Sequence, residues 1–263
     1  MIIQNKIKIS RKISVGNVAV GGGAFTFIAG PCAVEDEKTL SEIARAIKPL
    51  GADILRGGAF KPRTSPKDFQ GVGGRGLDML VKIAAELKMP TVSEIVDPRD
   101  AELFAGVDAL QIGAKNMQNF ALLKEVGRLR KPVLLKRGFC NTIEELLLAA
   151  EYIRGEGNED IILCERGIRT FEPTNRFTLD LGAVARLKTL TDLPVIVDPS
   201  HASGRSELVE PLALAAAAVG ADGIEVETHV SPERALCDSA QAILPETFGD
   251  IVEKCLKIRA AIK

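Results

Sequence analysis

Residues 132–167, PVLLKRGFCNTIEELLLAAEYIRGEGNEDIILCERG, decide the fold. The stretch begins with PVLLKRG (132–138) and ends with DIILCERG (160–167), two short apolar runs that are typical of buried strands. Between them, TIEELLLAAEYIRG (142–155) has apolar residues at helical spacing. A strand, a helix and a second strand in direct succession predict one repeat of an α/β protein.

The same alternation continues along the chain in both directions. The predicted strands are FTFIAG (25–30), DILRGG (53–58), PTVSEI (90–95), ALQIGA (109–114), PVLLKRG (132–138), DIILCERG (160–167), PVIVDPSH (194–201) and GIEVETH (223–229). The predicted helices include EKTLSEIARAIKPL (37–50), RGLDMLVKIAAELK (75–88), NFALLKEVGRLR (119–130), TIEELLLAAEYIRG (142–155), LDLGAVARLKTLT (179–191), SELVEPLALAAAAVG (206–220) and FGDIVEKCLKIRAAIK (248–263). Strand followed by helix, repeated eight times, matches a (β/α)8 TIM barrel better than a doubly wound sheet.

We expect residues 1–263 to form a single TIM-barrel domain, because no linker rich in Pro, Gly or Ser divides the chain. Residues 1–24 precede the first strand and alternate in the way a small hairpin does, which predicts a short N-terminal hairpin extension. The hairpin is expected to cover the N-terminal end of the barrel or to meet another subunit. A role in packing alone is the favoured interpretation.

Composition argues against several classes of protein. Hydrophobic residues make up 46% of the chain and charged residues 26%, unlike a disordered protein. The net charge of −1 and the lack of a basic tail argue against nucleic acid binding. No apolar run approaches the roughly 18–20 residues that span a bilayer, and the N-terminus lacks the apolar centre of a secretion signal. We therefore expect a cytoplasmic protein with neither nucleic acid nor membrane as a partner.

Polar side chains concentrate at the C-terminal ends of the predicted strands. The strand starts are apolar, whereas the ends carry Cys32, Arg56, Glu94, Lys115, Lys136, Arg166, Asp198, His201 and Glu227. In a (β/α)8 barrel these ends share the face that carries active sites. Any one of them alone would be interpreted as a solvated rim residue. Their convergence predicts a common cavity.

Cations dominate this predicted cavity. They are Arg56, Lys61, Arg63, Lys115, Lys136 and Arg166, with Arg137 and Arg205 as further candidates. Neighbouring cations repel one another, so the set needs anions, and phosphate is the usual one. One phosphate would not occupy so many cations, so we expect two phosphorylated substrates, one of which also carries a carboxylate. Lys136 alone would also fit a Schiff-base aldolase.

Four residues have the chemistry of a metal site: Cys32, His201, Glu227 and Asp238. A thiol, an imidazole and carboxylates together suit a divalent transition ion better than magnesium or calcium. Each has an alternative interpretation: Cys32 as a small buried residue, Asp238 as a helix cap before Ser239, and His229 as a competitor of His201. The five cysteines include no Cys-x-x-Cys pair, so the others are interpreted as buried thiols.

Seven motifs, in one order along the chain, carry a resemblance to a known family. They are GPCAVE (30–35), RGGAFKPRTSP (56–66), QIGAKNMQN (111–119), LLKRG (134–138), ILCERGIRTF (162–171), VDPSHASGR (197–205) and EVETHVSPERALCDSAQ (225–241). Together they resemble the 3-deoxy-D-arabino-heptulosonate 7-phosphate (DAHP) synthase family, and most closely its compact type I beta group.

The resemblance implies an aldol-like condensation of phosphoenolpyruvate with erythrose 4-phosphate, the first step of the shikimate pathway. It implies one divalent metal ion, such as Mn, Fe, Co or Zn, and a homodimer or homotetramer. It also implies a set of residues for each role. The metal ligands would be Cys32, His201, Glu227 and Asp238; the phosphoenolpyruvate site Arg56, Lys61, Ala114, Lys115, Lys136 and Arg166; the erythrose 4-phosphate site Lys61, Pro62, Arg63 and Thr64; and the catalytic residues Lys61, His201 and Cys32.

The chain departs from the family pattern at Lys115, where the family usually has arginine. Lysine keeps the charge but loses the planar fork that binds an anion through two hydrogen bonds, so weaker or different phosphoenolpyruvate binding is expected. We also expect neither the ferredoxin-like regulatory domain nor the chorismate mutase that some relatives carry, because only about 24 residues precede the first predicted strand and the last predicted helix runs to residue 263. We therefore expect no inhibition by aromatic amino acids through a fused domain.

Three other functions are weighed against this one. The nearest is the synthase that joins phosphoenolpyruvate to arabinose 5-phosphate to make 3-deoxy-D-manno-octulosonate 8-phosphate. Lys-Pro-Arg-Thr-Ser (61–65) favours the four-carbon acceptor, because the rival family has a different, Asn-containing sequence there. A non-catalytic barrel that binds phosphate ligands would be expected to lack some of the four metal-type residues, and all are present. A Schiff-base aldolase acting through Lys136 would not need a metal.

Overall fold

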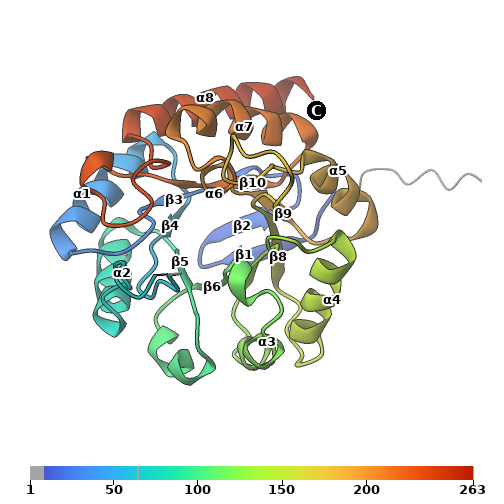
Figure 1. Ribbon diagram of the computed structural model, residues 1–263, viewed down its shortest axis with the longest axis horizontal. Coiled ribbons are helices and arrows are strands. Elements are labelled where there is room, and N and C mark those ends of the chain that lie inside the picture. Colours follow the sequence, from blue (N-terminus) through green and yellow to red (C-terminus); the bar gives the residue numbers. More distant parts are fainter. Residues whose placement is uncertain (1–8, 64, 263) are drawn as a thin grey trace, which may run out of the picture.

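The computed structural model describes residues 9–63 and 65–262. Eight parallel strands close into a barrel in the order β10-β3-β4-β5-β6-β7-β8-β9, and each strand lies inside the range predicted for it. They are β3 (Thr26–Gly30), β4 (Ile54–Arg56), β5 (Thr91–Glu94), β6 (Ala109–Ile112), β7 (Val133–Lys136), β8 (Ile161–Glu165), β9 (Val195–Val197) and β10 (Gly223–Glu227). The predicted (β/α)8 barrel is therefore confirmed (Figure 1).

Helices surround the barrel, as Figure 1 shows. They are α1 (Glu37–Ile47), α2 (Gly74–Leu87), α3 (Phe120–Arg128), α4 (Ile143–Arg154), α5 (Leu181–Leu190), α7 (Ser206–Val219) and α8 (Pro245–Ala261). Their ends follow local chemistry: α4, for example, begins with a capping box in which Thr142 and Glu145 each bond the other's backbone N–H. Across the described residues, none of the helices combines the length and the apolar character needed to cross a membrane.

The link between β5 and β6 differs from the predicted strand–helix repeat. It contains a 3₁₀ run, Pro98–Phe104, in place of an α-helix. Asp97 caps the start of this run by accepting a hydrogen bond from the Arg99 N–H, and Phe104 is buried at its end. In this link, the buried ring of Phe104 packs where an α-helix would otherwise cover the barrel.

The N-terminal extension forms an antiparallel hairpin of β1 (Lys12–Val15) and β2 (Val18–Gly21). Its buried side chains are Ile13, Val15 and Val20, and they cluster with inward-facing barrel residues that include Ile28, Val92, Leu134 and Ile196. The hairpin therefore covers the N-terminal end of the barrel, as predicted, and lies across its centre in Figure 1. Residues 1–8 of the predicted extension lie outside the described residues.

Candidate active site

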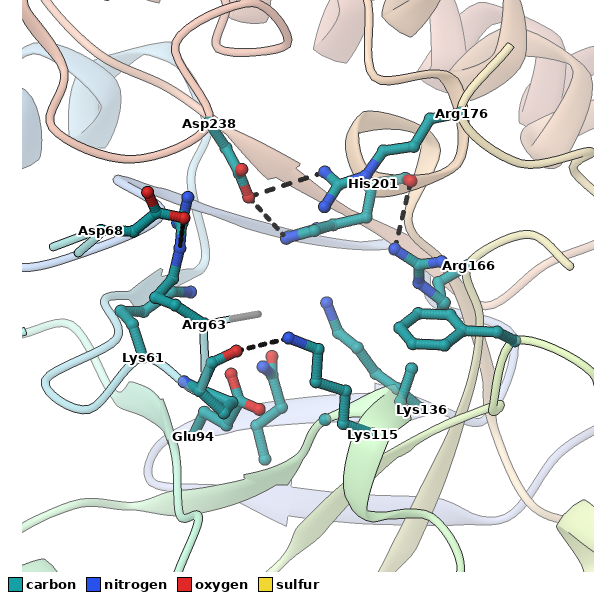
Figure 2. Close-up of a pocket in the computed structure, with 15 residues that line it drawn as sticks. Lys61, Arg63, Asp68, Glu94, Lys115, Lys136, Arg166, Arg176, His201 and Asp238 are labelled. Carbon is teal, nitrogen blue, oxygen red and sulfur yellow. Dashed lines mark hydrogen bonds and ion pairs between the residues drawn. The ribbon is translucent and has the colours of Figure 1, made fainter. Parts of the chain in front are cut away.

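A cavity of about 180 Å³ opens at the C-terminal ends of the barrel strands (Figure 2). Of the residues predicted for the site, nine line it: Lys61, Pro62, Arg63, Ala114, Lys115, Lys136, Arg166, His201 and Asp238. Three others, Cys32, Arg56 and Glu227, are buried. Cys32 and Glu227 contact residues of the cavity wall, and Arg56 contacts Cys32 and Glu227 behind it. Thr64 lies outside the described residues.

The four metal-type residues come together. Their ligand atoms, one each from Cys32, His201, Glu227 and Asp238, all lie within 4.8 Å of one another. His201 Nε2 is 3.1 Å from Glu227 Oε1 and 3.6 Å from Asp238 Oδ2, and Cys32 Sγ is 3.3 Å from the same Asp238 oxygen. A thiol, an imidazole and two carboxylates at this spacing fit a divalent transition ion.

His201 reaches this cluster from a short helix, α6 (Pro199–Ser203), and not from the end of a strand as the sequence suggested. Strand β9 ends at Val197 because Pro199 has no N–H for the sheet but suits the first turn of a helix. Asp198 caps α6 by accepting from the His201 backbone N–H, and its Oδ2 lies 2.7 Å from His201 Nδ1. This second contact leaves Nε2 directed at the cluster.

Two of the sequence alternatives for the cluster, Asp238 as a helix cap and His229 as a competitor of His201, differ from what the structure shows. Asp238 caps no helix: its backbone has a φ of 53°, and the next helix begins only at Pro245. His229 Nδ1 accepts a hydrogen bond from the Ser231 N–H, and His229 is not part of the group of four.

Beneath the cavity, buried cations and carboxylates form a network. Arg56 Nη1 lies 2.8 Å from Glu227 Oε1, and Arg56 Nε lies 3.4 Å from Glu225 Oε1. Burial alone would raise the pKa of Glu227, but His201, Arg56 and Lys61 lower it to about 2. Arg56 therefore faces carboxylates of the barrel and does not line the cavity.

Lys136 belongs to the same network. Its Nζ lies 2.5 Å from Asp198 Oδ2 and 2.7 Å from Glu225 Oε2. Burial alone would lower the pKa of Lys136, but these two carboxylates raise it above its usual range. Lys136 is thus held in the charged form, which suits an anion and not Schiff-base chemistry, because that chemistry needs a neutral amine.

The loop after β4 brings Lys61 and Arg63 to the other side of the cavity. Lys61 Nζ donates to the Cys32 carbonyl at 3.1 Å, while Arg63 contacts the Cys237 sulfur and lies 3.5 Å from Asp68. Burial opposes ionisation of Lys61, but Cys32 and Glu94 raise its pKa. Lys115 reaches this loop from across the cavity, since its Nζ donates to the Pro62 carbonyl at 2.6 Å.

Arg166 has one edge free for a ligand. Its guanidinium lies 4.2 Å from the Phe177 ring centre and 5.0 Å from that of Phe139, and its Nη2 donates to the His201 carbonyl at 3.2 Å. The side chain is 3% exposed, and Nη1 has no partner among the described residues. Burial lowers the pKa of Arg166. A buried, unpaired edge of this kind is suited to an anion.

Sequence reasoning missed several residues of the cavity wall. These are Asp68, Gln111, Gly113, Phe139 and Arg176. Glu94, which was predicted for the cavity from its place near a strand end but was given no role, lines it as well. Arg176 lies in the loop between β8 and α5, where no periodicity indicates orientation. Gln241, which contacts two of the metal-type residues, was also missed although it ends the last motif.

Comparisons with known proteins agree with the geometry. Residues 4–261 match the model of the DAHP synthetase I family. A curated relative from Thermotoga maritima, phospho-2-dehydro-3-deoxyheptonate aldolase, is 52% identical over 251 residues, which cover 95% of this chain and 74% of the relative. A more distant relative, the 2-dehydro-3-deoxyphosphooctonate aldolase of Geobacter sulfurreducens, is 31% identical over 97% of this chain and all of the relative.

Two solved structures from Thermotoga maritima are similar to the whole described fold. One is the crystal structure of phospho-2-dehydro-3-deoxyheptonate aldolase (DAHP synthase), with a TM-score of 0.93 and 51% identity, covering 97% of this chain and 75% of that one. The other is a truncated form of 3-deoxy-D-arabino-heptulosonate 7-phosphate synthase, with a TM-score of 0.90 and 48% identity, covering 97% of this chain and 94% of that one.

Proposed function

The chain belongs to the DAHP synthetase I family, and on that premise we propose that it condenses phosphoenolpyruvate with erythrose 4-phosphate. The products are 3-deoxy-D-arabino-heptulosonate 7-phosphate and phosphate, in the first step of the shikimate pathway. One observation carries the proposal: a four-residue cluster of metal-type side chains adjoins a cavity lined by Lys61, Lys136 and Arg166. Two phosphorylated substrates would supply the anions that these cations need.

The phosphoenolpyruvate site is proposed on the side of the cavity formed by Ala114, Lys115, Lys136 and Arg166, with Lys61 and the buried Arg56 supporting its charge. The free Nη1 edge of Arg166 supports this assignment, because a phosphate oxygen would satisfy it. Phe139 and Phe177 hold the guanidinium plane by stacking. Lys115 also lines the cavity, and its ammonium group would attract the substrate's anion as a single charge without the two-pronged hydrogen bonding of an arginine.

Erythrose 4-phosphate is proposed to bind along the loop of Lys61, Pro62, Arg63 and Thr64. Arg63 faces the cavity, with only about a quarter of its side chain exposed, and carries a charge suited to the acceptor's phosphate. The contact from Lys115 to the Pro62 carbonyl holds this loop against the donor side. Binding both substrates in one cavity places the reacting carbons together, which supplies much of the rate gain in such reactions.

Cys32, His201, Glu227 and Asp238 are proposed to hold one divalent ion such as Mn, Fe, Co or Zn. When bound, such an ion polarises the acceptor's aldehyde as a Lewis acid. His201 is oriented for this role by Asp198, and Arg56 contacts Oε1 of Glu227 while Gln241 donates to Oε2. The donor set excludes none of the four metals.

The reaction balances with the residues present. C3 of phosphoenolpyruvate bonds to the aldehyde carbon, the carbonyl electron pair moves to oxygen, and C2 gains oxocarbenium character. A water molecule then adds to C2 and loses one proton, which replaces the proton given to the new alkoxide. The C2 hydroxyl becomes a carbonyl as the C–O bond to phosphate breaks, and phosphate departs with the electrons of that bond and with the hydroxyl proton. We propose Lys61 as the proton donor to the new alkoxide, because it lines the cavity and its raised pKa means that it carries a proton to give. A water beside His201 is the alternative proton carrier.

We also propose that the chain acts as one catalytic domain within a homodimer or homotetramer. A cytoplasmic location is proposed because sugar phosphates do not cross membranes unaided. Neither proposal affects the assignment of the reaction.

The test of the proposed function compares acceptors. Purified protein is supplied with phosphoenolpyruvate and either erythrose 4-phosphate or arabinose 5-phosphate, and phosphoenolpyruvate loss is followed. We expect turnover with the four-carbon acceptor and at most a few per cent of that rate with the pentose. Turnover with the pentose alone would identify the octulosonate synthase instead. Binding of phosphoenolpyruvate with no turnover of either acceptor would identify a non-catalytic barrel.

A further inference from the structure

Gln241 is a buried amide beside the metal-type cluster. It lies in the segment between β10 and α8, and it is 2% exposed. Its Nε2 donates to Glu227 Oε2 at 2.5 Å and lies 3.5 Å from Asp238 Oδ2. Its Oε1 accepts from Arg176 Nη1 at 2.9 Å. Both ends of the amide are therefore used, and two of the partners belong to the cluster of four.

The partners dictate which way the amide points. Ionised carboxylates only accept hydrogen bonds, and an arginine only donates them. The NH2 end must therefore face Glu227 and Asp238, and the carbonyl end must face Arg176. The opposite orientation would place a carbonyl oxygen against two carboxylates and an NH2 group against a guanidinium. Figure 2 shows Arg176 and His201 both directed at Asp238. Because the amide of Gln241 bonds both Arg176 of the cavity wall and Glu227 of the cluster, it links the two.

The chemistry of an amide suits this position. Glu227 turns Oε1 toward His201 Nε2 and Arg56, while Gln241 holds the other oxygen. A neutral donor orients a carboxylate without cancelling its charge. A further lysine or arginine here, in addition to Arg56 beside Glu227 and Arg176 near Asp238, would compete with a bound cation. The amide thus holds both carboxylates without adding another positive charge.

We propose that Gln241 is a positioning residue that presents Glu227 and Asp238 to the metal ion. Arg176 acts as the anchor that fixes the orientation of the amide. The inference rests on the proposed function, since it assumes the metal site described above. Groups that hydrogen-bond to metal ligands in this way typically change metal affinity by roughly 10–100-fold when they are removed.

The test measures metal affinity directly, without turnover. Metal-free protein is titrated with cobalt(II), and the absorption of the Cys32 thiolate bound to cobalt reports occupancy. We expect Gln241→Met, which keeps the length of the side chain but removes the amide, to weaken cobalt binding by roughly 10–100-fold. Gln241→Asn, which keeps an amide that is one methylene shorter, should give a smaller loss in the same direction.

The matched control is Asn158→Leu, which removes another buried amide at the opposite end of the barrel. Asn158 is 3% exposed, donates to the Lys131 carbonyl and accepts from the Asp160 N–H. Its loss should leave cobalt affinity unchanged. Folding of each variant is verified by circular dichroism, and if Gln241→Met does not fold, Gln241→Asn decides the question.

The outcomes separate this inference from the proposed function. A folded Gln241 variant that binds cobalt within twofold of the unmodified protein would overturn the positioning role while the metal site stands. Equal weakening by Asn158→Leu would also overturn it, because the effect would then be general to buried amides. A parent protein with no thiolate-to-cobalt absorption would overturn both the inference and the metal site.

Discussion

Asp198 contacts both a proposed metal ligand, His201, and a proposed phosphate ligand, Lys136. One of its oxygens, Oδ2, faces both His201 Nδ1 at 2.7 Å and Lys136 Nζ at 2.5 Å. Burial alone would raise the pKa of Asp198, but His201 and Lys136 hold it well below its usual range. A single buried carboxylate thus orients a proposed metal ligand and anchors a proposed phosphate ligand.

Asp198→Asn should therefore reduce both stability and activity. Removing one partner of a buried ion pair leaves Lys136 with Glu225 alone, and such losses are typically about 3–5 kcal/mol. We expect the free energy of unfolding of the metal-free protein, measured in urea, to fall by about 3 kcal/mol. The condensation rate should fall at least tenfold, because His201 loses its orienting acceptor.

The control for this variant is Asp97→Asn, at the exposed pair with Arg99. Surface pairs contribute less than about 1 kcal/mol, so little change is expected. If Asp198→Asn destabilised the protein no more than Asp97→Asn, the buried network would not have the importance assigned to it.

For single residues, the sequence predicted which side chains lie near the site but not which of them contact one another. The placement of Arg56 at a strand end indicated a substrate ligand, yet the side chain faces Glu225 and Glu227. Which side chains form ion pairs depends on distances between neighbouring strands, and the spacing of residues along one strand gives no information on those distances. Lys115 shows the same limit, because its contact with the Pro62 carbonyl comes from a segment far away in the chain.

The helix α6 and the loop after β4 are the elements that deliver the chemistry. Asp198 and Pro199 start α6, and Gly204, with a φ of 67°, ends it after little more than one turn. The sequence suggested that the strand continued to His201, because VIVDPSH has an apolar start and no periodicity. The actual break follows from the missing N–H of Pro199.

The loop after β4 depends on Gly58. A Cβ atom at this position would lie 2.8 Å from the Cys32 carbonyl oxygen and 2.9 Å from Lys61 Cδ. Gly58→Ala should displace Lys61, so we expect kcat to fall at least tenfold and KM for both substrates to rise, while the protein stays folded.

Gly74→Ala is the comparison for that variant, since its Cβ would approach only Leu103, at 3.9 Å. Its kinetic constants should match those of the parent. If the kinetic constants of Gly58→Ala matched those of the parent, the position of Lys61 would not depend on Gly58, or the reaction would not depend on that position. Either result would contradict the role assigned to this loop.

The hairpin β1–β2 should matter for stability and not for chemistry. Ile13 is fully buried under the barrel, at the end opposite to the cavity. Ile13→Ala should lower the free energy of unfolding by about 2–4 kcal/mol through lost burial and the cavity left behind. The rate per folded molecule should not change.

Ser14→Ala, on the exposed face of the same strand, provides the reference and should alter neither quantity. A loss of activity in Ile13→Ala at temperatures where it remains folded would show that the hairpin influences the site across the barrel.

In the whole molecule, the β1–β2 hairpin closes one end of the barrel and the candidate active site opens at the other. The fold could be predicted because it rests on repeated patterns: buried strands such as Ile161–Glu165 and helices such as α4 with apolar residues on one face. Cys32, His201 and Glu227 could be predicted to meet because they lie at or just after the ends of barrel strands, which all open on one face, whereas Asp238 lies in the loop after β10. Arg176, Phe139 and Gln241 could not be predicted, because loop conformation decides where they point.

The central claim is that this barrel joins phosphoenolpyruvate to erythrose 4-phosphate with the help of a divalent ion. The most direct measurement follows phosphoenolpyruvate consumption by protein stripped with a chelator, with and without erythrose 4-phosphate, before and after a divalent metal such as Mn²⁺ is restored. We predict consumption only when acceptor and metal are both present. Consumption that continues at the same rate in the stripped protein, or that never requires the acceptor, would contradict the account.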